Sequence, residues 1–103
     1  GSPKKVIENI RIWNYLPSEI TNNLDSPLKN SIEIFRVCKI ISEQLEISQQ
    51  IVLINFIQII WWKKTSNKNI IKKLEELKIH IKNFVQPRLA WEVKLLEIAI
   101  NDL

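Results

Sequence analysis

Residues 51–62, with the sequence IVLINFIQIIWW, form the longest apolar segment of this chain. Ten of these twelve residues are apolar, and only Asn55 and Gln58 interrupt the run. A helix that is apolar on nearly every side has to be surrounded by other elements. A strand is disfavoured because twelve residues without alternation exceed the usual strand length. The segment therefore predicts a central helix inside a packed bundle, and it is shorter than the roughly 18–20 residues that span a bilayer.

The length of 103 residues suits one domain that buries roughly 60–70% of the surface of its unfolded chain. Residues 1–3 are interpreted as an expression scar, and residues 4–103 as a single helical domain. Residues 4–103 contain no glycine, so short hairpins that require positive φ are disfavoured. The fold class expected is all-α, a compact bundle of about five helices around a buried central helix.

Proline, serine and asparagine residues set the expected helix ends. A first helix is expected over residues 4–16, and a short helical turn follows Pro17 through Leu24. Ser26 and Pro27 predict the start of a helix that continues to about residue 46. Ser48 is the expected cap of the central helix, which ends where residues 63–67 make a turn. The fourth helix opens at residue 67 or 69, and Gln86-Pro87 ends it and starts the fifth.

Apolar residues at helical spacing predict which face of each helix is buried. For the helix after Pro27 the stripe is Leu28, Ile32, Phe35, Cys38, Ile41 and Leu45. For the fourth helix it is Ile70, Leu74, Leu77, Ile81 and Phe84, and for the fifth it is Leu89, Val93, Leu96, Ile100 and Leu103. The short connection between the last two helices predicts that they pack antiparallel.

The residues that most often perform chemistry do not form a recognisable site. His80 is the only histidine, and no metal ligand or orienting partner lies within one turn of it, which favours a surface position. Cys38 lies among apolar residues and is expected to be buried. Glu75 and Glu76 point about 100° apart on a helix and are expected to pair with nearby lysines. No catalytic, cofactor-binding or metal site is therefore predicted, and we expect a soluble, cytoplasmic protein that is not an enzyme.

Tryptophans are the candidates for contact with a protein partner. Trp61 and Trp62 are adjacent, so they cannot face the same neighbour on a helix and at least one is expected at the rim. An exposed tryptophan at the end of an apolar helix can anchor a partner. The alternative is that both fill the core from two sides. Trp91 and Arg88, at the start of the last helix, complete the expected partner-facing set.

Basic residues concentrate in the second half of the chain, which leaves nucleic-acid binding as an alternative. Residues 63–94 contain nine basic and three acidic residues, whereas residues 1–62 contain six of each. Lysines could neutralise phosphates, and tryptophans beside them could stack on bases. The candidate contacts are Lys63, Lys64, Lys68, Lys72 and Lys73. A solvated lysine-rich face explains the same charges, and lysine lacks the bidentate geometry of arginine.

Residues 74–98, LEELKIHIKNFVQPRLAWEVKLLEI, carry a resemblance to a known family. The turn Pro87-Arg88-Leu89, then Glu92 and the pair Leu95-Leu96, resembles the last helical hairpin of the collar domain in the tau/gamma subunit of bacterial sliding-clamp loaders. Trp91 departs from the aliphatic residue usual there. The resemblance covers about a quarter of the chain, and it implies an oligomerisation module of a replication ATPase in which Arg88 and Glu92 hold the hairpin.

These observations favour a non-enzymatic assembly module, with protein docking or self-association as its function. A small helical nucleic-acid-binding protein is the alternative. Salt-sensitive binding to nucleic acid would favour that alternative, since phosphate contacts release counterions.

Overall fold

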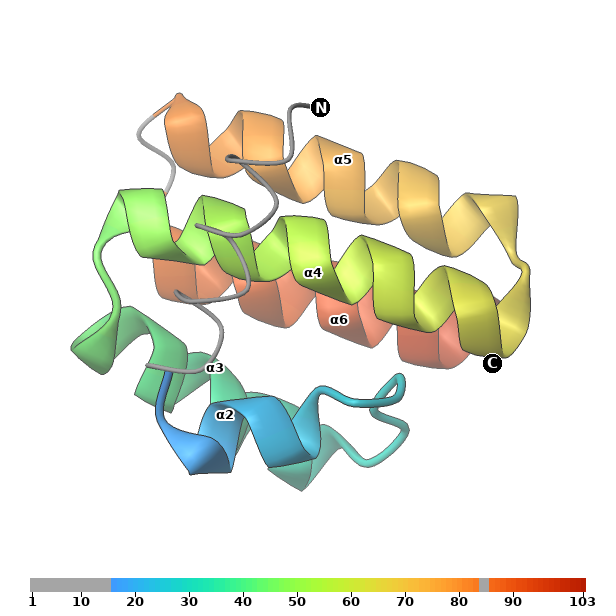
Figure 1. Cartoon of the computed structure of the whole chain (residues 1–103), viewed down its shortest axis with the longest axis horizontal. Helices are drawn as coiled ribbons and strands as arrows, with labels where there is room; N and C mark the ends of the chain where they lie inside the picture. The colour runs from blue at the N-terminus through green and yellow to red at the C-terminus, as the bar shows by residue number, and fades with distance from the viewer. Residues whose placement is uncertain (1–15, 84–85) are drawn as a thin grey trace, which may run out of the picture.

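A computed structural model of the chain describes residues 16–83 and 86–103. Within these ranges the backbone forms five helices and no strand (Figure 1). The helices are α2 (Ser18–Asn23), α3 (Ser31–Gln44), α4 (Ile47–Thr65), α5 (Lys68–Lys82) and α6 (Pro87–Asn101). The radius of gyration is 12.8 Å, about that of a folded chain of this length. The all-α bundle class is confirmed, and residues 4–15 of the first predicted helix lie outside the described residues.

The helices pack in an order that differs from their order in the sequence. The main contacts join α4 to α5, α5 to α6, α6 to α3 and α3 to α2. In Figure 1 α4, α5 and α6 run alongside one another, and α2 and α3 lie at one side of this group. The core contains buried apolar residues from every one of these helices.

The apolar segment at residues 51–62 is helical, and α4 extends beyond it on both sides. Leu53, Ile54, Ile57 and Trp61 are buried, as expected of a central helix. The expectation that the helix is enclosed on nearly every side is wrong at Ile59 and Trp62, which are exposed. The helices that pack on α4 cover only part of its circumference, so an apolar strip remains uncovered.

The predicted cap of α4 is also wrong. The N-cap residue is Glu46, whose N–H donates to Gln49 Oε1 over 2.8 Å, while Ser48 lies inside the first turn. A glutamine three residues after the cap can close a capping box, which explains why the helix begins two residues early.

The connection between α4 and α5 is shorter than expected, because α4 includes Lys63, Lys64 and Thr65. Only Ser66 and Asn67 link the two helices. Ser66 has φ +50°, the left-handed conformation that ends many helices. Thr65 Oγ1 donates to Trp61 O at 2.8 Å and accepts from Asn67 N–H at 3.2 Å. Asn67 then caps α5 by accepting from Asn69 N–H at 2.9 Å.

Helix α3 begins at Ser31, four residues later than the Ser26 and Pro27 signal predicted. Its cap is Asn30, whose Oδ1 accepts from Ile32 N–H at 2.8 Å. Asparagine caps helices as well as serine does. Leu28, within the intervening segment, is buried, and so is Leu24, which precedes it at the end of α2.

The buried face of α6 differs from the predicted one, whereas the stripe predicted around α3 is confirmed at Leu28, Cys38, Ile41 and Leu45. In α3 the buried residues are Ile34, Val37, Cys38 and Ile41, whereas the predicted Ile32 and Phe35 are exposed. In α6 the buried residues are Ala90, Trp91, Lys94, Leu95 and Ile98, whereas the predicted Leu89, Val93, Ile100 and Leu103 are exposed and Leu96 is half-buried. Helix α6 has two apolar stripes, and the one that contains Trp91 faces inward because Trp91 buries more apolar area than any aliphatic residue.

The prediction for α5 is confirmed at Ile70, Leu74, Leu77 and Ile81, which are all buried. Phe84 lies outside the described residues. The antiparallel packing of α5 and α6 is also confirmed, because Lys73 near the start of α5 reaches Asp102 beyond the end of α6.

Candidate functional site

Two of the predicted partner-facing tryptophans are core residues. Trp61 and Trp91 are both 0% exposed. The Trp61 indole donates to Leu24 O at 2.9 Å, and the Trp91 indole donates to Gln50 Oε1 at 3.0 Å. Buried indole N–H groups need such partners, so both side chains are held where a partner would not touch them. Trp62 and Arg88 remain as exposed members of the predicted set.

Gln50 is a buried polar residue that sequence reasoning missed. Its Nε2 donates to Leu45 O at 3.0 Å while its Oε1 accepts from Trp91. This amide therefore joins the first turn of α4 to α6, and both of its ends are satisfied. A glutamine in a helix start gives no sequence signal of that role, because its partner is 41 residues away.

The polar interruptions of the apolar segment fix the packing of α4 on α5. Gln58 Nε2 donates to Glu75 Oε2 at 2.8 Å, and Lys78 Nζ donates to Asn55 Oδ1 at 2.9 Å. Lys78 also pairs with Glu75 at 2.7 Å, as the spacing predicted. The hydrogen bond from Gln58, followed by the one from Lys78, lowers the pKa of Glu75. The polar groups of Asn55, Gln58, Glu75 and Lys78 are therefore engaged in contacts between α4 and α5.

A groove of about 830 Å³ opens between α4 and α5 beside these contacts. Its apolar part consists of Ile59, Trp62 and Ile71, and Trp62 is 43% exposed. Lys63, Lys68 and Lys72 line the same groove. We call these six residues the α4–α5 groove.

A second exposed apolar surface runs along α6. Leu89, Val93, Leu96, Ile100 and Leu103 recur every three or four residues and so share one face. Four of them are exposed, with Ile100 at 76%, and Leu96 is half-buried. We call this set the α6 outer stripe. The sequence identified its residues correctly as one apolar face but placed that face in the core.

Arg88 lies in the first turn of α6, next to this stripe. Its Nε donates to Glu92 Oε1 at 2.9 Å, an i,i+4 pair within the helix. The Arg88 side chain is 47% exposed, whereas that of Glu92 is 19% exposed. The pair therefore orients the guanidinium at the surface, and its remaining N–H groups point to no acceptor among the described residues.

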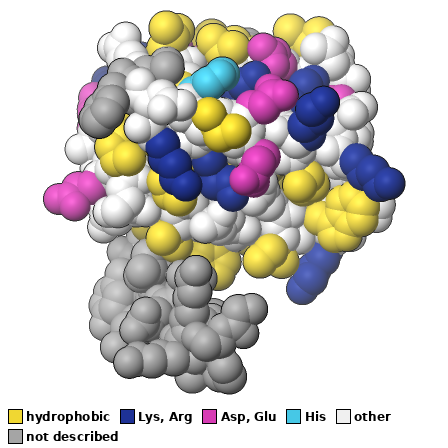
Figure 2. Space-filling view, turned by 90° about the horizontal axis from the view of Figure 1, so that it is seen from above, with side chains coloured by type: hydrophobic (Ala, Val, Ile, Leu, Met, Phe, Trp, Pro, Cys, Tyr) yellow, Lys and Arg dark blue, Asp and Glu magenta, His cyan; other side chains and the backbone are white. Residues whose placement is uncertain are grey.

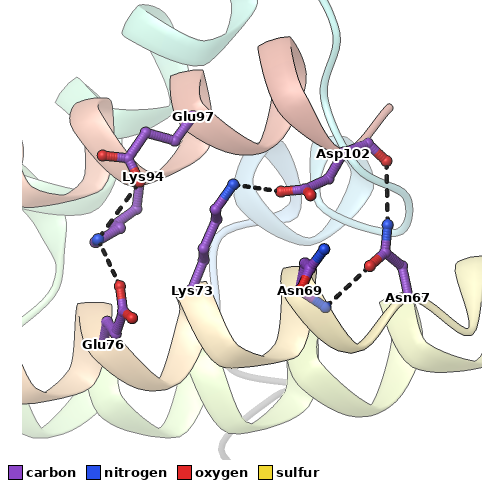
Figure 3. A network of polar contacts seen from close by, with 7 residues as sticks. All are labelled: Asn67, Asn69, Lys73, Glu76, Lys94, Glu97 and Asp102. Atoms are coloured by element: carbon purple, nitrogen blue, oxygen red, sulfur yellow. Dashed lines mark hydrogen bonds and ion pairs between the residues drawn. The ribbon is translucent and has the colours of Figure 1, made fainter.

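A polar network joins α5 to α6 on the other side of the helix (Figure 3). Lys94 lies on the buried face of α6, and its Nζ donates to Glu76 at 2.8 Å and contacts Glu97 at 3.5 Å. The hydrogen bond from Lys94 lowers the pKa of Glu76, and the same bond raises the pKa of Lys94 against the opposing effect of burial. Glu76 was expected to pair with lysines of its own helix: its main partner is Lys94 on α6, and Lys72 of α5 contributes a smaller electrostatic effect.

The five lysines predicted to contact nucleic acid do not act as one set. Lys73 forms a 2.6 Å ion pair with Asp102, whose side chain is nearly buried, so Lys73 supports the hairpin (Figure 3). Lys63, Lys64, Lys68 and Lys72 are exposed and have no ion pair with a described residue. Figure 2, seen from the side where α5 lies, shows lysine and arginine side chains separated by acidic and apolar ones. The face has no continuous basic track.

Other predicted positions are as follows. His80 is exposed, as expected for a surface histidine. Cys38 is fully buried, and burial raises the pKa of its thiol to about 12. No cluster of metal-ligating side chains occurs in the described part of the chain. Among the described helices, none is long and apolar enough to cross a membrane.

The comparison with protein families matches residues 1–98 to the cyanobacterial DNA polymerase III delta prime, C-terminal domain. This match spans nearly the whole sequence. The chain belongs to this family. Comparisons with curated proteins and with solved structures found no match.

The family relates the chain to DNA-replication clamp loaders, as the resemblance of residues 74–98 implied. The subunit is different, because the match is to delta prime and not to the tau/gamma collar. The hairpin motif thus led to the right group of proteins on a quarter of the chain.

Proposed function

We propose that this domain is a non-enzymatic assembly module that docks on another protein of a clamp-loader-related complex through the α6 outer stripe. The observation that supports it is the row of apolar side chains along α6 and just beyond its end, of which Leu89, Val93, Ile100 and Leu103 are exposed and Leu96 is half-buried. Exposed apolar residues are ordinary when scattered singly, but a contiguous row along one helix is typical of an interaction surface.

The geometry of the stripe suits a helix of the partner. Residues three and four apart form a ridge that packs into the groove of a neighbouring helix. Val93, Leu96 and Ile100 would form the centre of this contact. Arg88 lies at one end, where its free N–H groups can donate to a partner carboxylate or carbonyl. An apolar centre with an arginine at its edge is the usual composition of a protein interface.

The family supports assembly as the function, since the C-terminal domain of delta prime is an assembly domain without catalysis. As part of the same proposal, the protein is located inside the cell, with the other replication proteins. The partner is either a clamp-loader-related protein of the same genome or a second copy of this chain. Of the two, the first follows from the family, because clamp loaders are built from several different subunits.

The test is co-purification of the chain with the clamp-loader ATPase proteins of its own genome, together with light scattering of the chain alone. We expect Val93→Asp and Ile100→Asp to weaken the assembly by at least about tenfold, because a carboxylate would be desolvated at the contact. Ile79→Asp is the matched control, since Ile79 is an exposed isoleucine on α5 outside the stripe. Assembly that survives both stripe variants, or that Ile79→Asp weakens equally, would contradict the proposal.

A further inference from the structure

The α4–α5 groove is a second surface with the features of a binding site, and it lies on different helices from the α6 outer stripe. Its volume of about 830 Å³ is within the range of ligand sites. Its apolar part is formed by one aromatic and two aliphatic side chains, Trp62, Ile59 and Ile71. No described residue covers Ile59 or Trp62, both of which are exposed.

The polar groups at the back of the groove are already satisfied. Gln58 bonds to Glu75 and to Ile71 O, and Glu75 also pairs with Lys78. Asn55 accepts from Lys78. A ligand would therefore find few unpaired polar groups there and would have to match an apolar floor.

The charge at the groove is positive. Lys63, Lys68 and Lys72 line it, and none of them has an ion pair with a described residue. Glu75 is the acidic lining residue, and its charge is neutralised by Lys78 at 2.7 Å. Three unpaired ammonium groups around an apolar floor are complementary to a ligand that has carboxylates around apolar side chains.

The lining of the groove does not suit nucleic acid. Single strands are bound by rows of aromatic side chains on which successive bases stack, and this groove contains one tryptophan beside two isoleucines. The face seen in Figure 2, on the side where α5 lies, also carries acidic side chains among the basic ones. Ile59 and Trp62, three residues apart on α4, and Ile71, on the facing helix α5, form an apolar floor that accepts aliphatic or aromatic side chains of a peptide, as in helix-in-groove recognition.

We infer that the α4–α5 groove binds a short acidic amphipathic segment of a partner protein, with its apolar side chains on Ile59, Trp62 and Ile71 and its carboxylates facing Lys63, Lys68 and Lys72. The contact is separate from the assembly surface on α6. The apolar side chains provide most of the affinity, because ion pairs at an exposed rim are weak and screened by salt.

The probe is a fluorescein-labelled synthetic peptide of about twelve residues, with leucine and phenylalanine on one helical face and aspartate and glutamate elsewhere. Binding to the full chain is followed by fluorescence anisotropy. Two competitors are a peptide with the same apolar residues but lysines for the acids, and a single-stranded oligothymidine of similar length. We expect the acidic peptide to bind and the basic peptide to bind at least about tenfold more weakly.

Variants locate the contact. Lys63→Glu and Lys72→Glu should each weaken the acidic peptide by about three- to fivefold, whereas Lys64→Glu, an adjacent exposed lysine outside the groove, should change it less than about twofold. Trp62→Ala should abolish binding, and Ile79→Ala is its control. Equal binding to Trp62→Ala, equal effects of Lys63→Glu and Lys64→Glu, or tighter binding of oligothymidine than of the acidic peptide would overturn the inference. Val93→Asp should leave peptide binding intact, so failure at this groove and failure at the α6 outer stripe are distinguishable.

Discussion

Helices α5 and α6 have the same length and pack on each other, but they distribute their apolar residues differently. The main apolar stripe of α5, Ile70, Leu74, Leu77 and Ile81, is buried. Its other faces carry mainly charged and polar side chains. Helix α6 has two apolar faces, one centred on Trp91 and buried, the other on Val93 and exposed.

The comparison shows when a periodic pattern identifies the core. On α5 only one face can be buried without desolvating charges, so periodicity and burial agree. On α6 either face satisfies the pattern, and the choice depends on residues elsewhere in the chain. Surplus apolar residues on a helix therefore mark a surface that residues 16–83 and 86–103 do not cover, which is the basis of the assembly proposal.

The largest expected difference is between the two faces of α6. Trp91→Ala should lower the free energy of unfolding by about 3–5 kcal/mol, because it opens a large cavity and leaves Gln50 without its indole partner. Val93→Ala should change it by less than about 0.5 kcal/mol. Urea unfolding followed by circular dichroism measures both. Similar losses for the two variants would contradict the assignment of inner and outer faces.

On α5, alanine substitution of a buried and of an exposed residue should also change the free energy of unfolding by different amounts, with a smaller side chain removed from the core. Leu74→Ala should cost about 2–5 kcal/mol, since Leu74 is fully buried. Ile79→Ala should have little effect, because Ile79 is exposed. A large loss for Ile79→Ala in the same urea unfolding assay would show that α5, too, has two structurally important faces.

The ion pair between the helices should affect titration more than stability. Lys94→Met removes the hydrogen bond that lowers the pKa of Glu76, so this pKa should rise toward its ordinary value of 4.5. A carboxyl with a lowered pKa stabilises the fold above its unfolded pKa, and that contribution is lost as pH falls through the folded pKa. The variant should therefore lose less stability in acid than the original chain.

Carboxyl titration by NMR and unfolding midpoints at acidic and neutral pH measure this effect. At neutral pH the stability of Lys94→Met should change little, because the Glu76 side chain is 43% exposed and its carboxylate stays hydrated without Lys94. An unchanged Glu76 pKa in this variant would contradict the contact shown in Figure 3.

The last prediction involves no change in stability and concerns the reactivity of the Cys38 thiol. Cys38 lies on the buried face of α3, and burial raises its pKa to about 12. Because the thiolate is the reactive form, native protein should react with a thiol reagent at neutral pH far more slowly than unfolded protein. Labelling with and without denaturant measures the ratio. Fast labelling of native protein would mean that α6 does not cover this face of α3.

Much of the fold was predictable because it depends on local patterns. The helical conformation of residues 51–62, the buried face of α5 and the antiparallel last hairpin were predicted correctly from spacing and turn residues, whereas the enclosure of residues 51–62 on nearly every side was not. The start of α3 was not, because Ser26 and Asn30 are both good caps and only the burial of Leu24 and Leu28 decides between them. The face of α6 was missed for the reason given above.

The candidate surfaces were less predictable, because they depend on contacts distant in sequence. Trp61 and Trp62 are neighbours, yet Trp61 is buried, with its indole N–H donating to Leu24 O, whereas Trp62 is exposed. Lys72 and Lys73 are neighbours too, but Lys72 lines the groove while Lys73 binds Asp102. Sequence spacing located each pair, and only the packing of distant helices separates their members.

The two-residue connection between α4 and α5 has a consequence for any occupant of their groove. Thr65 bonds on both sides of the connection, and Asn67 both caps α5 and donates to Asp102 O at 3.4 Å. Ser66 takes up the reversal without glycine, so the link has little torsional freedom. The short link therefore holds α4 and α5, the two helices that form the groove, in a fixed arrangement and does not act as a hinge between them. An incoming segment would lose its own flexibility on binding, while the domain has almost none to lose.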